Sequence, residues 1–164
     1  MKIIYLISIG LFFQFVSVTV TAGENWQVRI DPEDRSRCLL ESVKNVFNDG
    51  QAETSVKLVY TGDALYAATK SNIDFDYPGI GLQVDRHEQH PIDEVYMKKT
   101  AVFSKNSDTL HKQFINGANA KLTLGFWPLI PKTKVHVIEF SLFGYTKAYQ
   151  QYLMCKKHKK QERG

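Results

Sequence analysis

VKLVYTGDALYAAT, residues 56–69, combines two strand-like runs and a turn in one short segment. Residues 56–60 contain Val56, Val59 and Tyr60, which favour strands, and residues 64–69 form a second, mainly apolar run. Between them, Thr61-Gly62-Asp63 has the composition of a turn. Two strand-forming runs joined by so short a turn predict a β-hairpin.

Runs of the same kind recur on both sides of this hairpin. We expect the further strands at residues 26–30, 38–47, 80–84, 95–103, 120–126 and 135–142. Short strands separated by turn signals are typical of an antiparallel sandwich. The sequence therefore predicts a mainly β, single-domain antiparallel β-sandwich with two short helices. The first is expected at residues 108–115, with Ser107 as its N-cap and Gly117 after its end, and the second at residues 145–154, close to the C-terminus.

The N-terminal segment has the pattern of a secretory signal peptide. One cation, Lys2, precedes an apolar run over residues 3–20, and small side chains end at Ala22. A retained membrane anchor is the alternative, but the run contains polar residues and no cationic cluster follows it. We expect cleavage between Ala22 and Gly23, a β-sandwich domain over residues 23–155, and a periplasmic or secreted protein that is soluble after cleavage.

The positive charge is concentrated at the C-terminus. The whole chain carries a net charge of +4, yet residues 156–164 alone hold five cations and one glutamate. This composition predicts a basic, solvated and disordered tail, and weak contact with an anionic surface is the alternative. An exported chain is not expected to bind nucleic acid.

The two cysteines permit one intramolecular pairing. Cys38 and Cys155 both follow the predicted signal peptide, and an even cysteine count in an exported chain indicates a disulfide. Closing a loop of more than 100 residues stabilises the fold by about 4–5 kcal/mol in the chain-entropy account. We expect a structural Cys38–Cys155 bridge, because the chain has no Cys-x-x-Cys redox motif.

Signs of catalysis and metal binding are few. His87 and His90, together with Asp85, could contribute ligands to Zn²⁺ or Cu²⁺, but their spacing suits a solvated connection between strands equally well. The chain contains no Gly-x-Ser-x-Gly nucleophile motif and no phosphate-binding loop. We expect no metal, no cofactor and no catalytic residue.

The strongest candidate for a binding surface is GFWPLIPK, residues 125–132. If Phe126 points into the core, Trp127 points the other way, onto a loop stiffened by two prolines. With Leu129 and Ile130, Trp127 would then form a preorganised contact surface. The alternative is that Trp127 is a buried lid over the end of the sandwich. Further aromatic candidates for a binding face are Tyr60, Tyr66, Phe75 and Tyr77, with packing in the core as the alternative.

Motifs in the C-terminal half resemble a known family. LQVD at residues 82–85, a strand ending at Phe103, a helix containing Leu110 and Phe114, and FSLFGYTKAY at residues 140–149 are similar to the invasion-associated locus B (IalB-like) family. The resemblance spans roughly residues 80–155. It implies an exported bacterial β-sandwich protein without established catalytic residues. This chain departs from the family in its cysteines, because the middle strand and helix carry none. A divergent envelope family is the alternative.

These features together predict an exported, non-catalytic binding or accessory protein of the bacterial envelope. Its expected partner is a protein or an envelope component, and an inhibitor-like role is one form of this function. The alternative is an envelope hydrolase that uses carboxylates dispersed in the sequence.

Overall fold

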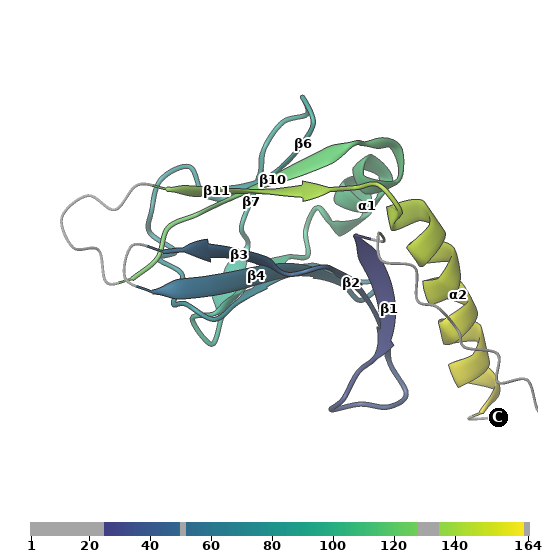
Figure 1. The fold of residues 1–164 in the computed structure, drawn as a ribbon. Coiled ribbons are helices and arrows are strands. Elements are labelled where there is room, and N and C mark those ends of the chain that lie inside the picture. The colour runs from purple at the N-terminus through teal and green to yellow at the C-terminus, as the bar shows by residue number, and fades with distance from the viewer. Residues whose placement is uncertain (1–24, 50–51, 128–134, 163–164) are drawn as a thin grey trace, which may run out of the picture.

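The computed structural model describes residues 25–49, 52–127 and 135–162. Two antiparallel sheets face each other, with the two helices at one end (Figure 1). The elements are β1 (Trp26–Ile30), β2 (Cys38–Ser42), β3 (Asn45–Asn48), β4 (Glu53–Tyr60), β5 (Leu65–Thr69), β6 (Gly81–Val84), β7 (His90–Pro91), β8 (Glu94–Tyr96), β9 (Thr100–Phe103), α1 (Ser107–Asn116), β10 (Asn119–Leu124), β11 (His136–Ser141) and α2 (Tyr145–Gln161).

The larger sheet has the order β1-β2-β4-β5-β9-β8, and β3 also pairs with β4. The smaller sheet has the order β11-β10-β6-β7. All of these pairings are antiparallel. The mainly β sandwich predicted from the sequence is therefore confirmed, as are the two helices, the second of them C-terminal.

Alternation along the strands produces the core between the sheets. On β4, Val56, Leu58 and Tyr60 are buried, and β10 buries Leu122 and Leu124. The predicted hairpin is present, with Tyr60 opposite Leu65. Gly62 in its turn adopts a φ of +101°, a conformation that side chains with a Cβ rarely reach.

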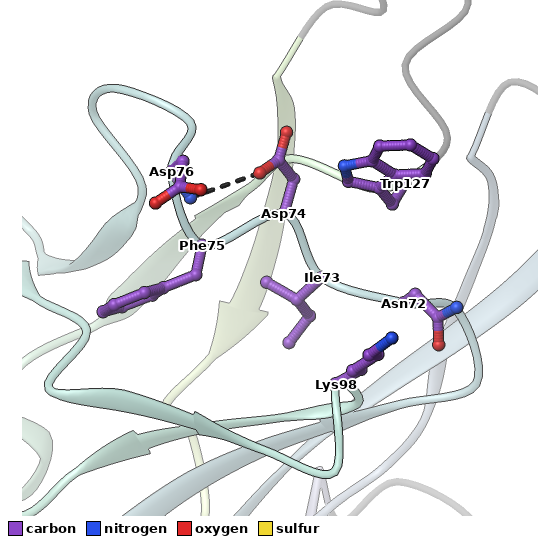
Figure 2. A pocket seen from close by; sticks show the side chains of 7 residues that line it. All are labelled: Asn72, Ile73, Asp74, Phe75, Asp76, Lys98 and Trp127. Atoms are coloured by element: carbon purple, nitrogen blue, oxygen red, sulfur yellow. Dashed lines mark hydrogen bonds between the residues drawn. The ribbon is translucent and has the colours of Figure 1, made fainter.

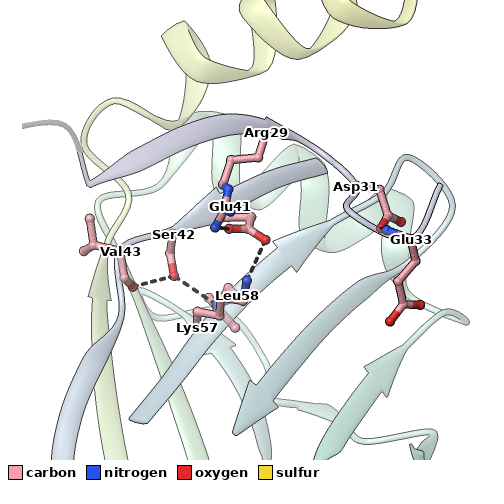
Figure 3. Close-up of polar contacts among 8 residues, drawn as sticks. All are labelled: Arg29, Asp31, Glu33, Glu41, Ser42, Val43, Lys57 and Leu58. Atoms are coloured by element: carbon pink, nitrogen blue, oxygen red, sulfur yellow. Dashed lines mark hydrogen bonds and ion pairs between the residues drawn. The ribbon is translucent and has the colours of Figure 1, made fainter. Parts of the chain in front are cut away.

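Two runs predicted as single strands are divided in the structure. The run over residues 38–47 breaks after Ser42, whose hydroxyl accepts the Leu58 N–H and donates to the Val43 carbonyl (Figure 3). The side chain thus takes over backbone hydrogen bonding where the ladder is interrupted. The run over residues 95–103 is a hairpin, because the chain turns between β8 and β9 with Met97 and Lys98 at φ values of 47° and 60°.

Glu41 is a buried carboxylate on the outer face of the larger sheet. Its Oε1 lies 2.6 Å from Nζ of Lys57, and Arg29 lies 3.6 Å from Oε2 (Figure 3). A buried charge needs such partners. The alternation that places Leu40 in the core turns Glu41 outward.

Helix α1 begins one residue earlier than predicted. Ser107 is the first helical residue, and Asn106 holds the cap position without a side-chain cap hydrogen bond. The prediction that Ser107 caps the helix is therefore wrong, because its hydroxyl is buried and has no hydrogen-bond partner among the described residues. Gly117 follows the helix as expected. A Cβ there would lie 2.7 Å from the Gln113 carbonyl oxygen, so the close approach of the two segments requires glycine.

Helix α2 covers the part of the larger sheet that β1 and β2 form (Figure 1). Tyr145, Ala148 and Tyr152 form its buried face. Cys155 is bonded to Cys38 across 117 residues of sequence, which confirms the predicted disulfide. The helix continues to Gln161. The prediction that the basic segment after Cys155 is disordered is therefore wrong for residues 156–161.

Candidate functional site

Backbone hydrogen bonds past the end of β10 place Trp127 at the surface. Trp127 N–H donates to the Asn72 carbonyl at 2.8 Å, and Asp74 N–H donates to the Gly125 carbonyl at 2.9 Å. Between these bonds, Phe126 forms an isolated bridge with Ile73. Phe126 is buried, whereas 63% of Trp127 is exposed. The predicted opposite orientation of the two rings is confirmed, and the alternative that Trp127 is a buried lid is wrong.

Trp127 forms one wall of a cavity of about 340 Å³, which we call the Trp127 pocket (Figure 2). The pocket is lined by Asn72, Ile73, Asp74, Phe75, Asp76, Lys98 and Trp127. Of the predicted contact residues, Trp127 lines the pocket and Phe126 packs in the core. Leu129 and Ile130 lie outside the described residues. Of the aromatic candidates, Phe75 belongs to the pocket and is half-exposed, whereas Tyr60 packs in the core.

Two carboxylates give the Trp127 pocket its polar character. Asp74 is only 7% exposed, and its Oδ1 accepts the backbone N–H of Asp76 at 3.2 Å. Figure 2 shows Asp74 beside Asp76, with Trp127 on its other side. A carboxylate can accept about four hydrogen bonds, so Asp74 retains capacity for a ligand that donates them. Among the described residues that line the pocket, Lys98 is the single cation.

A strained turn carries Lys98 to the pocket. Ile73 N–H donates to the Lys98 carbonyl at 2.7 Å, which ties the turn to the strand-like segment below Trp127. Met97 and Lys98 both have positive φ, as a type I′ turn requires, although neither is one of the residues that tolerate it best. Such strain persists only where the surrounding structure imposes it, and it is often found at functional sites.

No sequence pattern pointed to Asp74, Asp76 or Lys98 as residues of a site. They lie 29 to 53 residues before Trp127 in the chain, and the Ile73–Phe126 bridge and the β8–β9 turn bring them together. The alternation at residues 126 and 127 was the one feature that could indicate this location.

The weak metal candidates have structural roles. Both carboxylate oxygens of Asp85 accept backbone N–H groups, from Ala118 at 3.0 Å and Asn119 at 2.9 Å. These hydrogen bonds hold the pKa of Asp85 below its usual value. Nε2 of His90 lies 3.1 Å from the side-chain oxygen of Gln113, and His87 lies in the exposed turn after β6. Within residues 25–49, 52–127 and 135–162, no three metal-ligating side chains form a group.

A second concave surface lies at the helical end of the sandwich. A cavity of about 880 Å³ separates the last turns of α2 from the loops around Arg37 and Gly62. We call it the basic cleft and define it by the cations Arg37, Lys156, Lys157, Lys159 and Lys160 and the ring of Tyr152. The sequence indicated the lysines but not their arrangement, because the segment was expected to be disordered.

No protein-family model, no curated protein and no solved structure matches the chain. The resemblance to the invasion-associated locus B family therefore rests on the short motifs alone. Among the described residues, no helix has the length and hydropathy needed to cross a bilayer.

Proposed function

We propose that this chain is an exported, non-catalytic binding protein whose Trp127 pocket receives an arginine side chain of a partner protein. The observation that carries the proposal is the exposed indole of Trp127 beside the nearly buried carboxylate of Asp74. Export is supported by the N-terminal sequence pattern, and the Cys38–Cys155 disulfide is consistent with an oxidising compartment.

The chemistry of the pocket fits a guanidinium group. A planar cation stacks favourably on an indole face, and the guanidinium fork donates two parallel hydrogen bonds to a carboxylate. The lining contains two carboxylates against one ammonium, so a cation is favoured over an anion. A cavity of about 340 Å³ is at the lower end of the range for small-ligand pockets, which suits one long side chain.

The geometry favours binding over hydrolysis. Asp74 and Asp76 belong to one turn and are joined by a hydrogen bond (Figure 2). Glycoside hydrolysis requires two carboxyl groups that flank the scissile bond. Other carboxylates, such as Glu41 and Asp85, hold the fold together through ion pairs and backbone hydrogen bonds.

The proposal is tested by capture from an envelope extract with the chain lacking residues 1–22. Wild type is compared with Trp127→Ala and Asp74→Asn, and Phe143→Ala serves as the matched control because Phe143 is an exposed aromatic residue outside the pocket. We expect both pocket variants to lose the captured partner and the control to retain it. For a purified partner, loss of a central anchor lowers affinity by about 2 kcal/mol or more.

A competition experiment identifies the recognised group. N-acetyl-arginine amide should release the captured partner, whereas the neutral isostere N-acetyl-citrulline amide should not. Equal recovery of partners by wild type and Trp127→Ala contradicts the use of this pocket. Equal competition by the two amides contradicts recognition of a cation.

A further inference from the structure

The basic cleft brings together cations from separate parts of the chain. Arg37 lies in the loop before β2, whereas Lys156, Lys157 and Lys160 lie on the last turns of α2. Among the described residues that line the cleft, Asp63 is the only carboxylate. Five cations thus face one anion across a single concave surface.

Few of these cations are neutralised within the protein. Lys159 forms an ion pair with Glu162 at 2.8 Å, and Nζ of Lys156 lies 5.5 Å from the ring centre of Tyr152. Arg37, Lys157 and Lys160 make no ion pair with another of the described residues. Like charges held this close repel each other, and a bound anion relieves that repulsion.

The dipole of helix α2 explains the position of only some of the cations in the basic cleft. Cations in the last turn of a helix interact favourably with its dipole, which explains Lys159 and Lys160 in part. Arg37 is not on the helix and has no such role. Its convergence with the lysines on one cavity is an independent observation.

The cleft is fixed in shape before any ligand arrives. The disulfide from Cys38 to Cys155 joins its two walls. The hydroxyl of Tyr152 donates to the Thr61 carbonyl at 2.5 Å and makes a second link between them. Burial raises the pKa of Tyr152 to about 12, so this donor keeps its proton at physiological pH. A preformed site avoids the free-energy cost of ordering on binding.

We propose that the basic cleft binds a ligand bearing two or more phosphate groups. Phosphate matches both the fork of Arg37 and the compact charges of the lysines. The cleft volume of about 880 Å³ exceeds the needs of a single inorganic anion, and its five cations call for a ligand of similar charge density. The phosphates can belong to a soluble polyphosphate or to anionic lipid headgroups.

Calorimetric titration with inorganic triphosphate tests the soluble form of this ligand. The chain lacking residues 1–22 is compared with the cleft variant Arg37→Gln/Lys157→Gln/Lys160→Gln. The matched control is Lys44→Gln/Lys70→Gln/Lys112→Gln, which removes the same charge from exposed sites outside the cleft. We expect the cleft variant to bind triphosphate at least tenfold more weakly than wild type, and the control to stay within about twofold of it.

Sedimentation with vesicles distinguishes the source of the phosphates. Phosphatidylcholine vesicles with and without phosphatidylglycerol are used with the same three proteins. Cleft-dependent binding to phosphatidylglycerol vesicles supports a headgroup ligand, and cleft-dependent binding of triphosphate alone supports a soluble one. The proposal is overturned if neither probe binds, or if the control loses affinity as much as the cleft variant. It is independent of the Trp127 pocket, since Trp127→Ala should bind both probes as wild type does.

Discussion

The Trp127 pocket is held by backbone hydrogen bonds between strand segments, whereas the basic cleft is held by side chains of a peripheral helix. The pocket lies where the chain leaves β10, close to the start of β11. The cleft lies along α2, which follows the other end of β11 (Figure 1). Ligand binding in the Trp127 pocket should therefore persist when side-chain contacts are removed, whereas ligand binding in the basic cleft should weaken.

Removing the disulfide is expected to have the broadest effect, because it changes both the stability of the fold and the basic cleft. The double variant Cys38→Ala/Cys155→Ala should lose about 2–5 kcal/mol of unfolding free energy in urea titrations, because the bridge closes a loop with a sequence separation of 117 residues. It should also bind triphosphate more weakly, because one link between the cleft walls is gone. Arginine amide should still bind the folded fraction. If the variant binds triphosphate and arginine amide with equally reduced affinity, the two ends are not structurally independent.

The two tryptophans differ in burial, so their replacement should affect stability differently. Trp26 is 0% exposed, packs edge-on against Tyr145 and Phe114, and donates from Nε1 to the Ser141 carbonyl. Trp26→Ala should cost about 3–5 kcal/mol of unfolding free energy. Trp127→Ala should change it by less than about 0.5 kcal/mol, because its ring is exposed. Urea unfolding measures both, and a large loss for Trp127→Ala contradicts a role in binding alone.

The helical end is also expected to respond to pH. His111 stacks on Tyr60 at 4.9 Å, and its Nδ1 lies 2.8 Å from the hydroxyl of Tyr145. Burial lowers the pKa of His111 despite the opposing effect of Asp108. The unfolded chain, with a pKa near 6.5, therefore takes up the proton first.

The unfolding free energy should accordingly fall as the pH drops through about 6.5 and level off below the lowered pKa of His111. Comparison of wild type with His111→Gln in urea at neutral and mildly acidic pH isolates this contribution. A pH dependence that is unchanged in His111→Gln contradicts the assignment.

The smallest expected effect lies in the turn beside the Trp127 pocket. Met97 has a φ of 47°, which asparagine tolerates better than methionine. Met97→Asn should raise the unfolding free energy by about 0.5–1 kcal/mol, and arginine binding should stay unchanged because Met97 does not line the pocket. Thermal unfolding detects the gain. If Met97→Asn does not raise the unfolding free energy, the turn is not strained.

The parts of this protein that follow from local pattern could be predicted from its sequence. Two strand-forming runs around a turn identified the hairpin over residues 56–69, and alternation identified the opposite orientation of Phe126 and Trp127. Cysteine count identified the Cys38–Cys155 bridge. These features depend on neighbouring residues or on a pairing with no alternative.

The remaining features depend on contacts between distant segments. Asp74 and Lys98 reach Trp127 only through long-range backbone pairing, which no local pattern encodes. The lysines after Cys155 have a composition typical of disorder. The disulfide at Cys155 and the packing of Tyr152 nevertheless anchor the preceding turns, and the helix continues through these lysines.

Amide chemical shifts recorded in two successive titrations show whether the two ends of the molecule are separate sites with opposite charge preference. With N-acetyl-arginine amide, we expect shift changes around Asp74, Lys98 and Trp127. With inorganic triphosphate, we expect them around Arg37 and Lys157. Changes in the same residues with both ligands, or no localised change with either, would contradict the account.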